Sequence, residues 1–231
     1  IVDYTLLPAL NELAREQSKP TEETRKRAHQ IMDYAATFPN TFIRYHASDM
    51  ILNVESDAAY LVLPKARSRL AGLFNLGKHH PSSPANGPLL VECKTIKHVV
   101  SSAAEAETAA LFHNAQTSIP IRRLLIALGH PQPPTPIKID NSTALGFVHN
   151  NIQQRRSKSW DMRYFWIRDR ATQQQFNFHW KPGIHNYVDY FTKHHPTIHH
   201  RQNKTEFVKD SLNLLIQQMN KSICELRGCV N

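Results

Sequence analysis

The chain has 231 residues, 41% of them hydrophobic, which is enough for one large domain, or one domain with an appendage, around a real core. Lys and Arg outnumber Asp and Glu by 28 to 19, so the formal net charge is +9 and nucleic acid is the commonest kind of partner for such a surface. No apolar run approaches membrane-spanning length and no signal peptide is visible, so we expect no membrane association.

Two helices are predicted before any strand. Residues 4–17 have apolar side chains at helical spacing, and Thr21-Glu-Glu opens a second helix that runs to about Thr37, with acidic residues in its first turn. Pro39 and Asn40 end this part. We therefore expect residues 1–40 to form a helical appendage.

Strand-like patterns begin after residue 42. The predicted strands cover 50–55, 70–76 and 89–96, and the turn-rich residues 78–88 should form a hairpin loop between the last two. A long helix is predicted over 102–128, with a kink or a break at Pro120.

The remaining elements complete a mixed α/β pattern. Ile137-Lys-Ile-Asp reads as a short buried strand, Asn141 as a helix start, 161–173 as a helix, 176–180 as a strand and 186–194 as a final helix. The order predicts a five-stranded mixed sheet flanked by helices over 41–196. Residues 197–231 are expected to be a C-terminal tail, with a helix over 203–226 and a solvated stretch from His194 to Arg201.

Four acidic residues fit one site for two metal ions: Asp57 and Asp140 follow strand-like runs, Glu107 lies in an Ala-rich helical run, and Asp189 opens a short helical segment. Carboxylates are the preferred ligands of Mg²⁺, and two cations about 4 Å apart need several anionic ligands to screen their repulsion. The three aspartates also have ordinary explanations. Asp57 could end a strand, Asp140 could cap a helix, and Asp189 could complement a helix dipole.

Five segments, in this order and at these intervals, resemble the RNase H region of copia-type retrotransposon polyproteins. They are Arg44-Tyr-His-Ala-Ser-Asp-Met-Ile-Leu, Ser102-Ala-Ala-Glu-Ala-Glu, Ile139-Asp-Asn-Ser-Thr-Ala, Arg155-Arg-Ser-Lys-Ser-Trp-Asp-Met-Arg and Val188-Asp-Tyr-Phe-Thr-Lys. The resemblance covers about 40–196. Residues 1–40 resemble the end of the preceding reverse transcriptase. The chain begins Ile-Val-Asp without Met, as a fragment or a polyprotein product would.

The resemblance implies an RNase H fold and two-metal hydrolysis of RNA in RNA–DNA hybrids. The implied metal ligands are the four acids named above, for two Mg²⁺ ions, with Mn²⁺ as a substitute. The helix offers Glu105 as well as Glu107. Two residues apart on a helix is about 200°, so only one of them can face the site, and the family pattern favours Glu107. The family also suggests a catalytic role for His185, although His185 could equally be a surface histidine without a function.

Several residues are candidates for binding the hybrid. Asn141 and Ser142 could approach the 2′-hydroxyls that distinguish RNA from DNA. We expect phosphate contacts or stacking from a basic segment over 155–163 and from the residues before the second strand. The candidates are Arg155, Arg156, Lys158, Trp160, Arg163, Lys65, Arg67 and Arg69. Trp160 could instead belong to the core.

Three classes of function remain open. The first is an active ribonuclease H, attached to or associated with a reverse transcriptase and acting in a cytoplasmic particle or the nucleus. The second is a catalytically idle nucleic-acid-binding or interaction module of the same origin. The third is an integrase, which would use three acids and lacks the segments around Asp140 and Asp189. Four intact carboxylates favour the first class. The three cysteines form no metal-ligand spacing, and their odd number indicates a reducing compartment.

Overall fold

The computed structural model describes residues 3–77, 86–142, 145–146, 158–183 and 186–210, and the side chains of 158–161 are outside this description. The chain divides into two compact units. Unit 2 is His46–His194, and unit 1 combines Ile1–Tyr45 with His195–Asn231. No helix among the described residues is long and apolar enough to cross a membrane.

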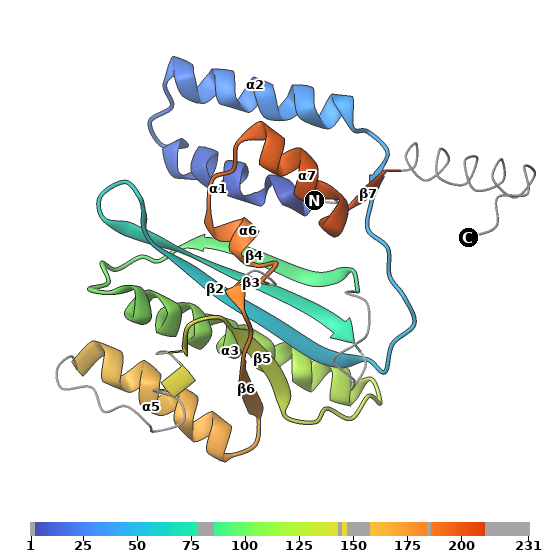
Figure 1. Ribbon diagram of the computed structural model, residues 1–231, viewed down its shortest axis with the longest axis vertical. Coiled ribbons are helices and arrows are strands. Elements are labelled where there is room, and N and C mark those ends of the chain that lie inside the picture. The colour runs from blue at the N-terminus through green and yellow to red at the C-terminus, as the bar shows by residue number, and fades with distance from the viewer. Residues whose placement is uncertain (1–2, 78–85, 143–144, 147–157, 184–185, 211–231) are drawn as a thin grey trace, which may run out of the picture. The chain divides into compact units, whose positions relative to one another are not determined.

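Unit 2 is built on the five-stranded mixed sheet that the sequence predicts (Figure 1). Strands β2 (Ile51–Leu63), β3 (Arg67–Gly77) and β4 (Pro88–Thr95) form an antiparallel meander. Strands β5 (Thr135–Ile139) and β6 (Phe176–Trp180) continue the sheet parallel to β2. The order β4-β3-β2-β5-β6 therefore puts β2 at the centre, and the fold is RNase H-like.

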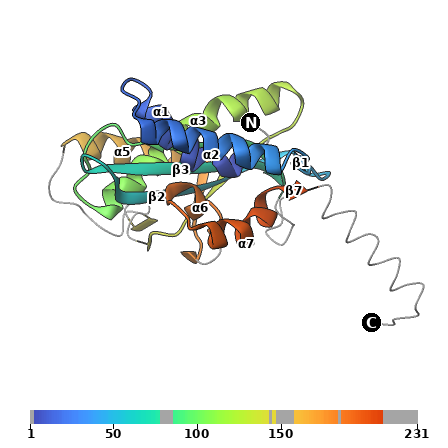
Figure 2. The ribbon, with the colours of Figure 1, turned by 90° about the horizontal axis from the view of Figure 1, so that it is seen from above.

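Helices cover both faces of this sheet (Figures 1 and 2). Helices α3 (Ala103–Ala127) and α5 (Lys158–Thr172) pack on one face, and the short helix α6 (Asp189–Thr192) lies against the other. The long predicted helix is confirmed, and it passes through Pro120 as one element. The final helix is much shorter than predicted, because Asn186 to Val188 form a turn.

The core of unit 2 lies between the sheet and α3. Leu52 and Val54 on β2, Phe74 on β3 and Leu111 on α3 are fully buried there, together with Ile137. The alternation along β2 sends Leu52 and Val54 toward α3, so the intervening residues face the α6 side. This alternation determines which carboxylates of β2 point away from the apolar core.

The turn between β2 and β3 consists of three residues, Pro64, Lys65 and Ala66. Lys65 and Ala66 both have positive φ, 60° and 52°, a conformation that favours Gly or Asn. The sequence offers neither Asn nor Gly at these positions. The turn therefore carries a strained backbone, and it presents Lys65 to solvent.

Unit 1 consists of helices from both ends of the described chain. A 3-10 turn, η1 (Tyr4–Leu6), leads into α1 (Leu7–Glu16), and α2 (Glu22–Thr37) follows after a capping box at Thr21. Both predicted N-terminal helices are thereby confirmed. The short strand β1 (Thr41–Phe42) pairs with β7 (Lys209–Asp210).

Helix α7 (Thr197–Phe207) completes unit 1 and corrects two expectations. The stretch expected to be a solvated tail begins this helix. The helix expected over 203–226 is interrupted, because Val208 is extended and β7 follows. The Tyr4 hydroxyl donates to the Phe207 carbonyl at 2.6 Å. The predicted division into 1–40, 41–196 and 197–231 stays a prediction.

Lys204 ties the parts of unit 1 together. Its ammonium lies 3.6 Å from Asp3 Oδ2, 3.5 Å from the centre of the Phe38 ring and 4.7 Å from that of Tyr34. Burial lowers the pKa of Lys204, while Asp3 opposes this effect. A buried cation over two aromatic rings and beside one carboxylate links α7 to η1 and α2.

Candidate metal centre

Asp57 lies on the central strand, on the α6 side of the sheet. Its side chain is 3% exposed and accepts two hydrogen bonds from residues close to α6. The Thr192 hydroxyl donates to Oδ2 at 2.7 Å, and the Asn186 amide donates to Oδ1 at 3.1 Å. Both donors hold the carboxylate in one orientation.

The structure separates the two candidate glutamates of α3. Glu105 accepts hydrogen bonds from the backbone N–H and the hydroxyl of Ser101, both at 2.7 Å, while the Ser102 hydroxyl accepts from the Glu105 N–H. This arrangement caps the start of the helix. Glu107 points instead to the middle of β2, where its carboxylate accepts from the backbone N–H of Ala58.

Asp140 directly follows β5, the parallel neighbour of β2. The indole Nε1–H of Trp180 donates to its backbone carbonyl at 2.9 Å. Gly183 passes so close that a Cβ there would lie 3.2 Å from Asp140 Oδ2. The end of β6 and the residues after it therefore pack against Asp140 at two points, and at Gly183 a side chain would have to displace the carboxylate.

Asp57, Glu107 and Asp140 converge. Each offers a carboxylate oxygen, and these atoms lie within 4.8 Å of one another. Burial raises the pKa of Asp57 from its usual 3.8 to about 7; Asp140 and Asp189 add to this effect, while Thr192 and Lys193 oppose it. Burial, followed by the charges of Asp57 and Asp140, also raises the pKa of Glu107 well above its usual value. The group is thus strongly disfavoured as three bare anions.

Asp189, the fourth candidate, begins α6 and lies beside this group rather than within it. Its charge raises the pKa of both Asp57 and Glu107, so it is near. Its own carboxylate pairs with the ammonium of Lys193, one helical turn later. Burial lowers the pKa of Lys193, but the bond to Asp189 and the charges of Asp57 and Asp140 raise it overall. Lys193 is a cation held at the edge of the carboxylates.

These residues fit a divalent metal centre. Hard oxygen ligands suit Mg²⁺, and a cation would offset both the burial of the charges and the mutual repulsion that together raise the pKa of Asp57 and Glu107. Glu107 Oε2 is buried and has no hydrogen-bond partner among the described residues. A buried carboxylate oxygen without a donor is a natural ligand position for a cation.

Three residues that support the carboxylates were not predicted as site residues: Asn186, Thr192 and Lys193. Thr192 and Lys193 lie in the Tyr-Phe-Thr-Lys segment that carries the family resemblance, so the sequence contains a signal for them. Asn186 has no such signal, since only the turn before α6 brings its amide to Asp57.

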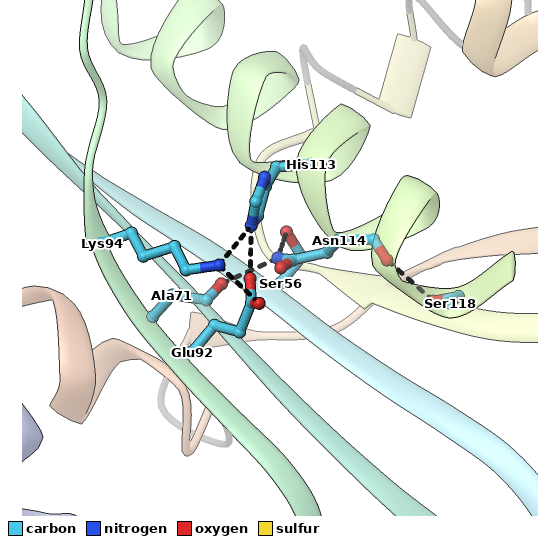
Figure 3. Close-up of polar contacts among 7 residues, drawn as sticks. All are labelled: Ser56, Ala71, Glu92, Lys94, His113, Asn114 and Ser118. Atoms are coloured by element: carbon cyan, nitrogen blue, oxygen red, sulfur yellow. Dashed lines mark hydrogen bonds and ion pairs between the residues drawn. The ribbon is translucent and has the colours of Figure 1, made fainter. Parts of the chain in front are cut away.

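A polar network connects α3 with the strands beside Asp57 (Figure 3). Asn114 on α3 is fully buried, and its amide donates to the Ser56 hydroxyl and the Ala71 carbonyl, both at 2.8 Å. A Cβ at Gly72 would lie 2.3 Å from Asn114 Oδ1, so glycine is required there. The network fixes the helix that carries Glu107 against the strand that carries Asp57.

The same view shows a second group, formed by Glu92 and Lys94 on β4 and His113 on α3 (Figure 3). The Lys94 ammonium lies 2.7 Å from Glu92 Oε1, and the His113 ring contacts the other carboxylate oxygen. Glu92 is buried, which by itself raises its pKa, but the bonds to His113 and Lys94 lower it overall. This group ties α3 to the edge strand.

The described candidates for nucleic-acid binding lie in different surroundings. Lys65 and Ser142 are exposed, and Asn141 is half-buried. Arg67 donates to the Lys97 carbonyl. Arg69 is only 1% exposed, and a guanidinium inside the protein is not available to a phosphate, so the expectation for Arg69 is corrected.

Arg163 on α5 also has partners within unit 2. Its guanidinium lies 2.6 Å from His98 Nε2 and 5.9 Å from the centre of the Phe112 ring. Burial, and then the Arg163 charge, lower the pKa of His98, so the ring is a neutral acceptor at pH 7. Arg155, Arg156 and His185 lie outside the described residues, as do the side chains of Lys158 and Trp160.

No family model matches the sequence, and no curated protein matches it. Solved structures do resemble the chain. The N-terminal RNase H domain of a Mycobacterium tuberculosis protein, fused to maltose-binding protein, is 14% identical, with 62% of this chain and 91% of that chain covered and a TM-score of 0.44. LC11-RNase H1 in complex with an RNA/DNA hybrid is 11% identical (60% and 91% covered, TM-score 0.45). The prototype foamy virus RNase H domain is 10% identical (64% and 91% covered, TM-score 0.43). Such low identities and scores leave the function to be read from the site itself.

Proposed function

We propose that the chain is a ribonuclease H that hydrolyses the RNA strand of RNA–DNA hybrids. The observation that supports this most is the convergence of Asp57, Glu107 and Asp140, with Asp189 beside them, on an RNase H-like sheet. Burying mutually repelling carboxylates destabilises a fold. A cation-dependent reaction gives a physical reason to keep them.

The four carboxylates would hold two Mg²⁺ ions, with Mn²⁺ as a substitute. When bound, these ions supply a more acidic water and stabilise the negative charge that develops on the phosphate and the leaving oxygen. Hydrolysis breaks the bond between phosphorus and the 3′-oxygen, which leaves 5′-phosphate and 3′-hydroxyl ends.

The protein groups position this chemistry. The donors Thr192 and Asn186 fix the Asp57 carboxylate, and the Trp180 indole fixes the backbone of Asp140. Lys193 holds Asp189 and offsets part of the negative charge that would otherwise repel a phosphodiester. The net charge of +9 attracts the polyanion as a whole.

The finer identity is also proposed. The five sequence segments support an origin in a copia-type retrotransposon polyprotein, with residues 1–40 derived from the end of a reverse transcriptase. The protein would then act in a cytoplasmic particle or the nucleus, attached to or associated with that polymerase.

The test compares an RNA–DNA hybrid, duplex RNA and duplex DNA as substrates, each with Mg²⁺, Mn²⁺ or EDTA. We expect the RNA strand of the hybrid to be cut with either ion and nothing to be cut in EDTA. Equal cutting of all three duplexes would contradict hybrid specificity. Tight hybrid binding without any cutting would show a catalytically idle module instead.

A further inference from the structure

Trp180 is the last residue of the edge strand β6. Phe176 and Phe178 are buried at the preceding alternate positions, so the pleat directs Trp180 to the same side. Even so, 52% of Trp180 is exposed. Indole groups are usually well buried because of their large apolar area, so this one offers an open aromatic face to a ligand.

The exposed indole is fixed beside the carboxylates. Its Nε1–H donates to the carbonyl of Asp140, one of the three converging acids. The next residue, Lys181, is anchored as well, with its ammonium 3.0 Å from Glu55 Oε1 on β2. The ring is therefore held by one edge at the rim of the candidate metal centre, and it does not swing freely.

We propose that the open face of Trp180 stacks on an unpaired nucleobase that flanks the hybrid held at the carboxylates. This inference rests on the proposed function and adds a feature of the substrate to it. Inside a continuous duplex, both faces of each base are covered by its neighbours. A side chain can therefore stack on a base only at an end, a nick or a single-stranded flank, as single-strand-binding proteins do with their aromatic residues. The enzyme would favour junctions between hybrid and single strand.

Binding is measured with the Asp57→Asn protein, so that turnover does not intervene. One substrate is a hybrid with a single-stranded flank whose first unpaired base is the fluorescent analogue 2-aminopurine. The matched, closed substrate is the same hybrid with the flank fully base-paired to a complementary strand. We expect binding to quench the probe. Adding the Trp180→Ala change to this protein should lower its affinity for the flanked substrate roughly 5- to 150-fold. The closed substrate should bind equally well with or without the change.

Two further variants separate stacking from other roles. Trp180→Phe keeps an aromatic face but lacks the N–H donor to Asp140, so it should keep most of the affinity. Phe165→Ala removes an aromatic residue of similar exposure on α5 and should change nothing. The slope of log affinity against log salt should stay the same in Trp180→Ala, because losing a stacked base releases no counterion from a phosphate.

The outcomes distinguish the two proposals. If the Asp57→Asn protein binds neither substrate, the proposed function fails and the inference fails with it. If it binds the hybrid but the probe is as bright bound as free, or Trp180→Ala binds both substrates as its parent does, the stacking is wrong and the function stands. Should Trp180→Ala not fold, the quenching in the parent and the affinity of Trp180→Phe decide.

Discussion

Asp57 is a carboxyl group of the candidate metal centre that destabilises the folded protein when it is ionised. It is buried beside two other acids, and its pKa is raised from 3.8 to about 7, mainly by burial. That difference is equivalent to roughly 4 kcal/mol of destabilisation when the group is ionised in the metal-free protein.

This pKa predicts a pH dependence of stability. Because the folded-state pKa exceeds the unfolded one, the folded protein keeps a proton that the unfolded chain releases between about pH 4 and pH 7. The Asp57 contribution to the free energy of unfolding should therefore fall as the pH rises through that window. Asp57→Asn should remove this fall, abolish turnover and stabilise the protein above pH 7 by up to roughly 4 kcal/mol.

Urea unfolding in EDTA at pH 5 and pH 8 measures the effect. The matched control is Asp169→Asn, which changes an exposed acid on α5 and should leave the pH dependence as it is. Adding Mg²⁺ at pH 8 should stabilise the wild-type chain more than Asp57→Asn. Identical pH profiles for wild type and Asp57→Asn would show that Asp57 is not the strained acid.

Gly183 gives a second prediction at this scale. A Cβ there would lie 3.2 Å from Asp140 Oδ2, so Gly183→Ala should displace that carboxylate by a few tenths of an ångström. We expect turnover to fall roughly tenfold, because small misplacements at a reacting centre are costly. The affinity for Mg²⁺, measured by calorimetry, should fall as well. Gly183→Val should lower both the turnover and the affinity further than Gly183→Ala does. Full activity in both variants would mean that Asp140 can move freely.

At the residue scale the sequence predicts the acidic residues of the site better than the residues that hold them in place. Asp57, Glu107 and Asp140 stand in or after recognisable strands and helices, the family resemblance implies them as ligands, and the structure brings them together. Asn186 and Trp180 were not identified, since their importance arises from a turn and from the end of an edge strand, which no periodic pattern marks. Arg69 was misjudged because its charge suggested exposure.

At the scale of elements, α3 performs two tasks with one stretch of sequence. Glu105 and Ser102 cap its first turn, and Glu107, two residues later, points to Asp57. The network around Asn114 then sets the distance of the helix from β2 and β3. The helix start is therefore both a structural cap and the carrier of a candidate ligand.

Paired amide substitutions distinguish these tasks. Glu105→Gln should weaken the cap by about 1 kcal/mol and leave turnover within a few-fold of wild type. Glu107→Gln should abolish turnover and should not lower the free energy of unfolding, because the pKa of Glu107 is already raised by burial. Thermal unfolding and hybrid cleavage, measured on both proteins, give the answer. The reverse pattern would mean that Glu105 is the ligand.

The strands and long helices follow from periodicity, and the ends of elements do not. The five strands and the helix over 102–128 are predicted from apolar spacing, and the mixed sheet from the order of the elements, but the first strand, predicted over 50–55, continues to Leu63. Helix α6 is shorter than predicted because Asn186 to Val188 form a turn before it, in which the Asp189 N–H donates to the Asn186 carbonyl. The break at Val208 was missed because apolar residues continue at helical spacing beyond it.

At the scale of the molecule, unit 1 depends on the segment after His194. The contacts of Tyr4 with Phe207, and of Lys204 with Asp3 and Phe38, join it to the N-terminal helices. A chain shortened after His194 should lose amide protection in α1 and α2, while β2 and α3 stay protected.

Hydrogen exchange measures this difference. Lys204→Met, which keeps the length of the side chain without its charge, serves as a milder control and should loosen α2 less than the truncation does. Unchanged protection of α1 and α2 in the shortened chain would show that these helices are stable without α7.

The position of Tyr4 and Phe207, 203 residues apart, also dictates an order of events during synthesis. A ribosome adds about 5–20 residues per second, so roughly 10–40 s pass between the two residues. During that interval helices α1 and α2 lack their contacts with α7, while all of unit 2 is synthesised and can fold. Loop closure across unit 2 is less costly once unit 2 is compact than across a disordered chain of that length. Helices α1 and α2 are therefore expected to be among the last elements of this chain to reach their final structure.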